Sequence, residues 1–158
     1  MKVENSNIIF DEDDIYNLDS VLSSIIVNAI TKFKELNNSV PGCMYTDGSG
    51  RSPSPEETQI ASDNWHAILD TIIYSFSEHD VNELFNTYRS KLGLGPCPYN
   101  YKADCFVNGI FDVPLNKSFT EVDAKEWSDS RELFMVNHKK TIDSGRLLLI
   151  KYFDNLWI

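Results

Sequence analysis

Residues 45–51, with the sequence YTDGSGR, carry side chains whose types and spacing could do chemistry. The backbone N–H groups of a Gly-rich loop can surround a phosphate, and a guanidinium can neutralise its charge. Asp-Gly and Gly-Ser-Gly sequences are also typical of turns that bind nothing. The pattern therefore favours a turn-forming loop and keeps phosphate binding as an alternative. The candidate binding residues in it are Tyr45, Asp47, Gly48, Ser49, Gly50 and Arg51.

Asp47 is the one residue of this loop that suggests metal-dependent catalysis, because YTDGS resembles the first metal-binding strand of ribonuclease H-like nucleases. Two-metal hydrolysis needs three or four carboxylates around Mg²⁺, the first of them on a rigid central strand. Here the string follows Pro41-Gly42 and runs into further glycines, and no second strand of this kind follows. We therefore predict no metal site.

The histidines, at positions 66, 79 and 138, form no HExxH motif and no zinc spacing. GxSxG, GxxxxGK[ST] and GxGxxG are also absent from the sequence. We therefore predict a protein with no catalytic residues and no cofactor. An enzyme in which Asp47, Glu121 or a histidine converges with other groups is the minor alternative.

Several aromatic residues lie in segments that are not predicted to be helical. Aromatic side chains in loops often anchor binding surfaces, because each buries a large area at little cost in entropy. The alternative is that these rings cover the ends of a helical bundle, and the sequence favours neither. They complete the set of candidate binding residues: Tyr45, Tyr99, Tyr101, Phe106 and Phe111.

Hydrophobic periodicity predicts the helices that must position these segments. An apolar stripe covers Asn17–Leu36 and ends before Pro41-Gly42, and residues 39–54 read as a long surface loop. Ser54-Pro55-Glu56-Glu57 combines an N-cap hydroxyl, a proline at the first helical position and a Glu that closes a capping box. This helix should continue to Phe76. Asp80 then marks the start of a shorter helix that Gly93 closes.

The C-terminal half of the sequence changes from a strand signal to a helical one. Asn108-Gly109 lies between two β-prone runs and predicts a small β-hairpin insertion at about residues 104–113. From Ser118 onward the pattern is helical, and we expect Ser144-Gly145 to kink or split this long segment. The predicted fold is mainly α, a helical bundle of four to five helices with this hairpin inserted.

The overall charge limits the partners of the protein. The chain has 158 residues, with 14 Lys and Arg against 24 Asp and Glu, and a net charge of −10. This balance predicts one acidic domain over residues 1–158, with residues 1–13 as a flexible acidic arm. It argues against binding to a nucleic-acid backbone or to an anionic membrane surface.

The expected location is the cytoplasm. The first residues lack the apolar core of a signal peptide, and no run of 18 apolar residues occurs. Cys43, Cys97 and Cys105 form no CxxC pair, which favours reduced thiols over a disulfide framework. A single Cys97–Cys105 bond is the open alternative.

Three longer strings point to a relationship. Lys32–Asn38 followed by Pro41, then Trp65–Phe76, and finally Gly145–Leu148 with Lys151–Trp157 resemble motifs of a family of small, mostly uncharacterised tailed-bacteriophage proteins. Ile72 replaces a usual Met of that family, and Ser75 a usual Ala. The resemblance implies an accessory protein made in the cytoplasm of an infected bacterium, and it implies no catalytic residue.

Two functions follow as hypotheses. The first is a non-catalytic counter-defence factor that binds and inhibits a bacterial host protein. The second is a small-molecule binder that sequesters a nucleotide immune signal, with Gly48–Arg51 on the phosphate and aromatic faces on the base. A homo-oligomer would suit the second function, because a pocket for a nucleotide is often completed by another subunit.

Overall fold

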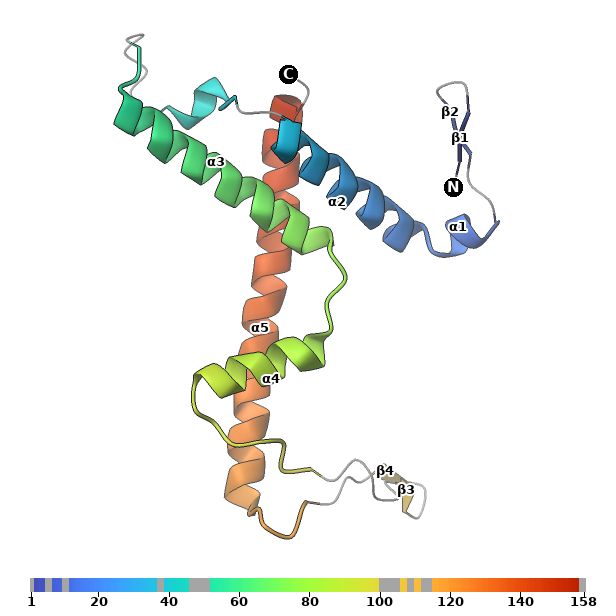
Figure 1. The fold of residues 1–158 in the computed structure, drawn as a ribbon. Coiled ribbons are helices and arrows are strands. Elements are labelled where there is room, and N and C mark those ends of the chain that lie inside the picture. The colour runs from blue at the N-terminus through green and yellow to red at the C-terminus, as the bar shows by residue number, and fades with distance from the viewer. Residues whose placement is uncertain are drawn as a thin grey trace. The chain divides into compact units, whose positions relative to one another are not determined.

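The computed structural model describes residues 2–4, 7–9, 12–36, 39–45, 52–99, 106–107, 110–111 and 115–156. These residues are mainly helical, and the prediction of a helical bundle is confirmed (Figure 1). The helices of this part of the chain are α1 (Glu12–Tyr16), α2 (Leu18–Leu36), α3 (Pro55–Phe76), α4 (Val81–Lys91) and α5 (Glu121–Tyr152), with short 3₁₀ turns η1 (Gly42–Met44) and η2 (Phe153–Leu156).

Two pairs of short strands accompany the helices. β1 (Lys2–Glu4) and β2 (Asn7–Ile9) are antiparallel, with Val3 opposite Ile8, in the segment that we predict as an acidic arm. β3 (Phe106–Val107) and β4 (Ile110–Phe111) are also antiparallel, with Phe106 opposite Phe111. The rest of the predicted insertion at about residues 104–113 lies outside the described residues, so the insertion as a whole stays a prediction.

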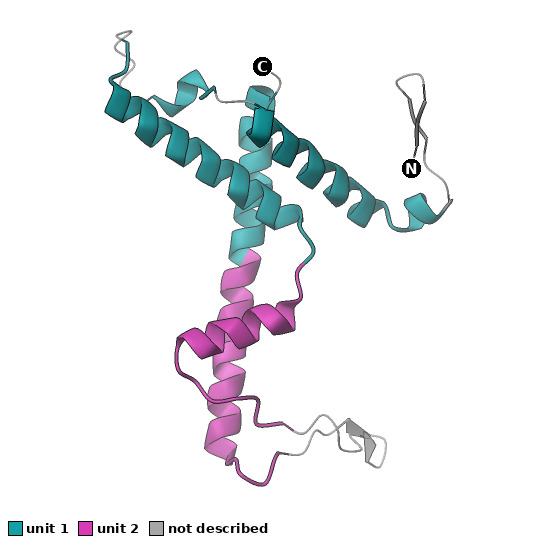
Figure 2. Ribbon diagram, viewed as in Figure 1, with its two compact units in different colours: residues 1–78, 140–158 teal, residues 79–139 magenta. Residues whose placement is uncertain are grey.

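The chain divides into two compact units (Figure 2). Unit 1 comprises residues 1–78 and 140–158, and unit 2 comprises residues 79–139. α5 is one continuous helix, and each unit contains one part of it. The single domain over residues 1–158 stays a prediction.

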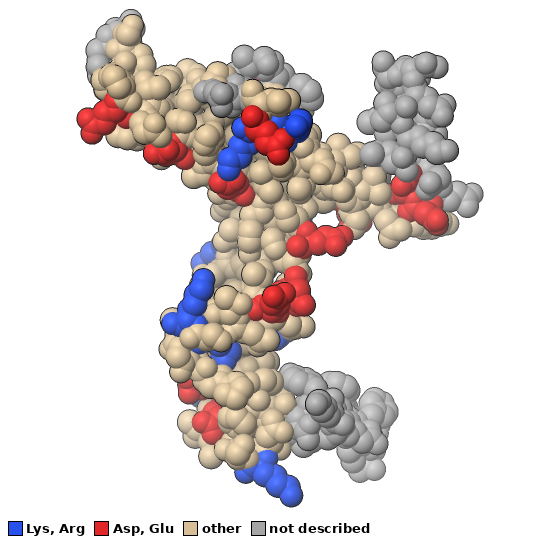
Figure 3. Space-filling model, viewed as in Figure 1, with Lys and Arg blue, Asp and Glu red and all other residues tan. Residues whose placement is uncertain are grey.

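Charged side chains are spread over the face of the molecule that Figure 3 draws. On the face drawn in Figure 3, red Asp and Glu side chains occur on both units and are separated by uncharged surface. Several acidic residues lie in first helical turns, where carboxylates stabilise the helix: Asp19, Glu56, Glu57, Glu83, Glu121 and Asp123.

The helix starts confirm the caps predicted from the sequence. At α3, the Glu57 backbone N–H donates to Ser54 Oγ (3.2 Å) and the Ser54 N–H donates to the Glu57 carboxylate (2.7 Å). At α4, Asp80 Oδ1 accepts the N–H groups of Asn82 and Glu83, and Gly93 with φ 68° follows the end of the helix. Local sequence thus defines both ends of α4 and the start of α3.

α5 begins with a similar reciprocal pair, between Thr120 and Asp123. The Thr120 backbone N–H donates to Asp123 Oδ2 (2.7 Å), and the Asp123 N–H donates to Thr120 Oγ1 (3.3 Å). The bonds from Thr120 lower the pKa of the Asp123 carboxyl, because they stabilise its charged form.

The core of unit 1 lies where α2, α3 and the end of α5 meet. Its fully buried members are at most 5% exposed: Ile30, Trp65, Leu69 and Ile72. Trp65 packs edge-on against Phe33 of α2 (6.4 Å between centroids) and Tyr152 of α5 (5.5 Å). Trp65 therefore joins all three helices.

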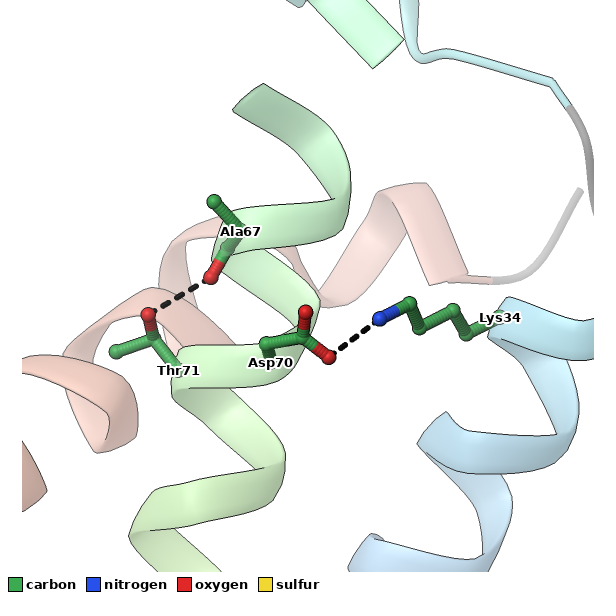
Figure 4. A network of polar contacts seen from close by, with 4 residues as sticks. All are labelled: Lys34, Ala67, Asp70 and Thr71. Carbon is green, nitrogen blue, oxygen red and sulfur yellow. Dashed lines mark hydrogen bonds and ion pairs between the residues drawn. The ribbon is translucent and has the colours of Figure 1, made fainter. Parts of the chain in front are cut away.

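A polar network lies beside this core, on the surface of α2 and α3. The Lys34 ammonium donates to Asp70 Oδ1 at 2.5 Å, and the Thr71 hydroxyl donates to the carbonyl of Ala67 at 2.7 Å (Figure 4). The Asp70 side chain is 60% exposed, so solvent screens the ion pair. The apolar core, rather than this pair, holds α2 against α3.

α5 is one continuous helix through Ser144-Gly145, so the expected split is wrong, and the kink stays a prediction. Gly145 is buried against α3, and a Cβ atom there would fall on Ser75 Oγ and the Thr71 carbonyl, and 2.7 Å from Ser75 Cβ. Ser75 Oγ itself donates to the Thr71 carbonyl (2.7 Å). The glycine therefore serves the close approach of two helices and does not end one.

Candidate functional site

Unit 2 contains a hollow of about 430 Å³ between α4, α5 and the segment after α4. We call it the aromatic–arginine hollow, and its lining residues are Asn82, Phe85, Asn86, Cys97, Trp127 and Arg131. The periodicity of the two helices explains this lining. Phe85 and Asn86 lie three and four residues after Asn82 on α4, and Arg131 lies four residues after Trp127 on α5.

Aromatic rings form the base of the hollow. Phe85 is 1% exposed, and its ring centroid lies 5.4 Å from both Trp127 and Phe134. Tyr88 stacks on Phe85 at 6.4 Å and lies 5.4 Å from Phe134. This cluster holds α4 and α5 together within unit 2, so the base of the hollow is rigid.

Arg131 covers these rings with its guanidinium. Its Cζ lies 5.5 Å from the centroid of Phe85 and 5.3 Å from that of Trp127, which is cation–π geometry. Its Nη2 donates to Asn82 Oδ1 at 3.2 Å. A guanidinium carries five N–H donors, and this bond uses one of them. The hollow therefore combines apolar area with a fixed positive charge.

Arg89 fixes the segment that forms the other wall. Its side chain is buried, Nε and Nη2 both donate to the Gly95 carbonyl (3.1 and 2.8 Å), and Nη1 donates to Ser130 Oγ (2.6 Å). The Ser130 hydroxyl donates in turn to the Trp127 carbonyl. Arg89 is thus a positioning residue that ties residues 94–98 to both helices, and with them Cys97.

Tyr99 is the one predicted site residue that the structure places beside the hollow. Its ring packs edge-on against Trp127 at 5.4 Å. Its backbone is held by a bridge to Leu115 and by the Asn116 side chain, and the Asn116 N–H donates to the carbonyl of buried Pro98 (2.8 Å). These contacts join residues 98–99 to the segment that precedes α5.

The other predicted site residues are not brought to this hollow. Tyr45 is half-buried after η1 and belongs to unit 1. Phe106 and Phe111 are described only as paired strand backbone. The remaining candidates lie outside the described residues: Asp47, Gly48, Ser49, Gly50, Arg51 and Tyr101. The predicted phosphate loop therefore stays a prediction.

Arg131, Asn82 and Asn86 line the hollow although none of them is among the site residues predicted from the sequence. A signal for Arg131 exists: Trp127, Arg131, Phe134 and His138 recur at steps of four, three and four, so one helix face carries an arginine within an aromatic stripe. Cys43 and Cys97 are free cysteines, and Cys105 lies outside the described residues, so the Cys97–Cys105 bond stays an open alternative.

Two histidines that are distant in sequence meet in unit 2. The rings of His79 and His138 are 5.4 Å apart and edge-on, and His138 also stacks on Phe134. Burial lowers the pKa of His138 below its ordinary value of 6.5, and the charge of His79 lowers it further. Unfolding removes both effects, so the unfolded chain binds protons more readily and stability falls as the pH drops below about 6.5.

We expect the loss of thermal stability between about pH 7.5 and about pH 5.5 to be smaller in His79→Gln than in the wild type. The substitution removes the like charge that faces His138. Thermal unfolding at both pH values measures this difference, and His66→Gln controls for the loss of one imidazole. An unchanged pH dependence in His79→Gln would show that the two imidazoles do not interact.

Within the described ranges, no three His, Cys, Asp or Glu side chains lie close enough together to hold a metal ion, and no helix has the length and hydropathy needed to cross a membrane. Comparisons with models of protein families, with curated proteins and with solved structures find no match to this chain.

Proposed function

We propose that this protein is a non-catalytic phage accessory protein that binds and inhibits a bacterial host protein, as a counter-defence factor in the cytoplasm of the infected cell. The observation that carries the proposal is the aromatic–arginine hollow, with Arg131 over the rings of Phe85 and Trp127. The resemblance of three sequence motifs to tailed-phage proteins supports the proposal that the protein is made by a phage in an infected bacterium.

The composition of the hollow suits a protein partner. Trp, Tyr and Arg dominate the residues that carry most of the energy in protein interfaces, and they act best in well-packed pockets. Trp127, Tyr99 and Arg131 come together here on a rigid base. Because the lining contributes one cation and two amides, a carboxylate or backbone carbonyl of the partner is the best complement to Arg131.

Affinity capture from a bacterial lysate tests the proposal. Arg131→Glu should weaken binding of the captured partner at least about 30-fold, the effect of losing one strong interface residue. Lys125→Glu is the matched control, because it makes the same charge change at an exposed site of the same helix. The partner should be identified by mass spectrometry and its affinity measured with purified proteins.

If Arg131→Glu and Lys125→Glu both capture the partner as well as the wild type does, the partner binds elsewhere on the protein. Loss of binding in Lys125→Glu as well would point to general charge rather than to the hollow. Circular dichroism of each variant distinguishes loss of binding from loss of fold.

A nucleotide ligand is the second candidate, favoured by the same rings and guanidinium. The volume of about 430 Å³ lies within the range of small-molecule pockets. A base could stack on the plane of the Arg131 guanidinium while its N–H groups donate to a phosphate, because the rings of Phe85 and Trp127 beneath it are buried. Thermal shift and calorimetry against a panel of nucleotide signals test this function. A nucleotide that binds the wild type but not Arg131→Glu would replace the protein-binding proposal, and no binding across the panel would remove the nucleotide one.

A further inference from the structure

A second hollow, of about 530 Å³, adjoins the aromatic–arginine hollow within unit 2. Asn86 and Cys97 line both hollows, so these two residues mark the place where one hollow passes into the other. The other residues that line the second hollow are Arg89, Ser90, Leu94, Gly95 and Pro96. We call the two hollows together the α4 groove. All of its lining residues belong to unit 2.

Both walls of the second hollow are fixed before any partner binds. One wall is α4, and the other is the segment of residues 94–97. The Leu94 N–H donates to the Arg89 carbonyl (3.1 Å), and the Arg89 side chain donates twice to the Gly95 carbonyl. Because these bonds already order the segment, a ligand of the groove loses little affinity to the ordering of this wall.

The two hollows differ in the side chains that they suit. The first contains Arg131, whose guanidinium keeps N–H donors for a carboxylate. In the second hollow the Arg89 side chain is buried, and three of its five N–H donors already bond to Gly95 and Ser130. Leu94 and Pro96 add apolar surface there. The second hollow therefore suits an apolar side chain.

The two hollows follow each other along α4 at the spacing of alternate residues in an extended chain. On α4 the first hollow spans Asn82 to Asn86, and the second spans Asn86 to Ser90. This offset of four helical residues corresponds to about 6 Å. In an extended chain, alternate side chains lie on the same face about 6.6 Å apart. One extended segment can therefore place two alternate side chains in the two hollows.

Asn86 distinguishes an extended segment from a helical one, in which residues four apart have a similar spacing. Its side chain is exposed at the junction of the hollows and makes no hydrogen bond within the part of unit 2 that the structure describes. An amide both donates and accepts, as a peptide group does. The backbone groups of a helix are bonded to one another, whereas those of an extended segment are free to pair with Asn86.

We propose that the α4 groove binds an extended peptide segment that carries an Asp or Glu and, two residues away, an apolar residue. The carboxylate accepts from Arg131, the apolar side chain occupies the second hollow, and Asn86 bonds to the backbone between them. This inference rests on the proposed function, because it names the kind of segment by which the groove holds the host protein.

Selection of short peptides from a random display library, with the full chain as bait, tests the groove without the host protein. The selected peptides should share an Asp or Glu two positions from an apolar residue. Calorimetry with a purified selected peptide should show binding at least about 30-fold weaker for Arg131→Glu. Asn86→Ala, which removes the backbone bonds, and Ser90→Phe, which fills the second hollow, should each weaken it about 10-fold. Thr87→Phe is the matched control, because Thr87 is an exposed residue of α4 that lines neither hollow.

The thiol of Cys97 gives a second measurement at the junction of the two hollows. The sequence contains three cysteines, so Cys43→Ser/Cys105→Ser leaves Cys97 as the single thiol. A saturating selected peptide should slow the alkylation of Cys97 by iodoacetamide several-fold, because the peptide covers this residue. Circular dichroism of each variant should show unchanged helix content, since Asn86, Ser90 and Thr87 are exposed.

A library that yields no specific peptide, or peptides without a shared Asp or Glu, would overturn the proposal. A shared spacing of three or four residues would indicate a helical segment and overturn the extended one, and so would equal loss of binding in Thr87→Phe and Ser90→Phe. Selected peptides that bind as expected, while no host protein is inhibited, would support the groove and contradict the proposed function. Capture of a host protein that depends on Arg131, without any selected peptide, would support the proposed function and overturn this inference.

Discussion

Gly145→Leu is expected to cost unit 1 about 3 kcal/mol or more of unfolding free energy. The new side chain would have to occupy space that Ser75 Oγ and the Thr71 carbonyl already fill. A backbone carbonyl cannot rotate away as the end of a flexible side chain can. α3 and α5 would therefore have to separate, which would open the contacts between Trp65 and Tyr152.

Gly145→Ala separates this steric effect from helix propensity. In an open helix, alanine would stabilise by about 1 kcal/mol relative to glycine, whereas here the added Cβ should reverse the sign. Ser144→Ala is the control, because Ser144 is the exposed neighbour on the same helix. Adding Ser75→Gly to Gly145→Ala should recover part of the loss, since it removes two of the three atoms in the way. Denaturant unfolding measures all four variants, and a Gly145→Ala variant more stable than the wild type would contradict the close crossing of α3 and α5.

Phe85→Ala is expected to cost about 3–5 kcal/mol and to remove the base of the aromatic–arginine hollow. Phe85 contacts Trp127, Phe134 and Tyr88, and it lies under the guanidiniums of Arg89 and Arg131. Its removal leaves a cavity at the centre of unit 2 that these rigid neighbours cannot fill. Phe85→Ala should therefore destabilise unit 2 and no longer bind the host protein that the wild type captures.

Near-ultraviolet circular dichroism and hydrogen exchange measure this effect within unit 2. Leu92→Ala is the control, because Leu92 is 56% exposed at the end of α4 and its truncation should change stability little. Phe85→Leu should lose less than Phe85→Ala, since it fills more of the cavity. Equal stability of Phe85→Ala and Leu92→Ala would show that the ring cluster does not hold unit 2 together.

The parts of the fold that sequence could predict are those set by neighbours in the chain. The Ser54/Glu57 capping box and the Asp80 cap each act within four residues, so their patterns are visible without knowledge of the fold. The long stripe of α2 is likewise a local property.

The parts that sequence could not predict depend on which helices meet. Gly145 reads as a break because glycine disfavours helix, and only its contact with Ser75 explains its presence inside α5. From the sequence alone, Arg131 is an ordinary surface cation. Its contact with the ring of Phe85 depends on the packing of α4 against α5. His79 and His138 are 59 residues apart in the sequence, and only the packing of unit 2 joins them.

The most direct test of the proposed function is inhibition of the captured host protein. The purified partner should be assayed while wild-type protein, Arg131→Glu or Lys125→Glu is added. The proposed function predicts that wild type and Lys125→Glu abolish the partner's activity at equal molar amounts, and that Arg131→Glu needs at least about 30-fold more protein for the same inhibition. A partner whose activity is unaffected by saturating wild-type protein, or is inhibited equally by Arg131→Glu, would contradict it.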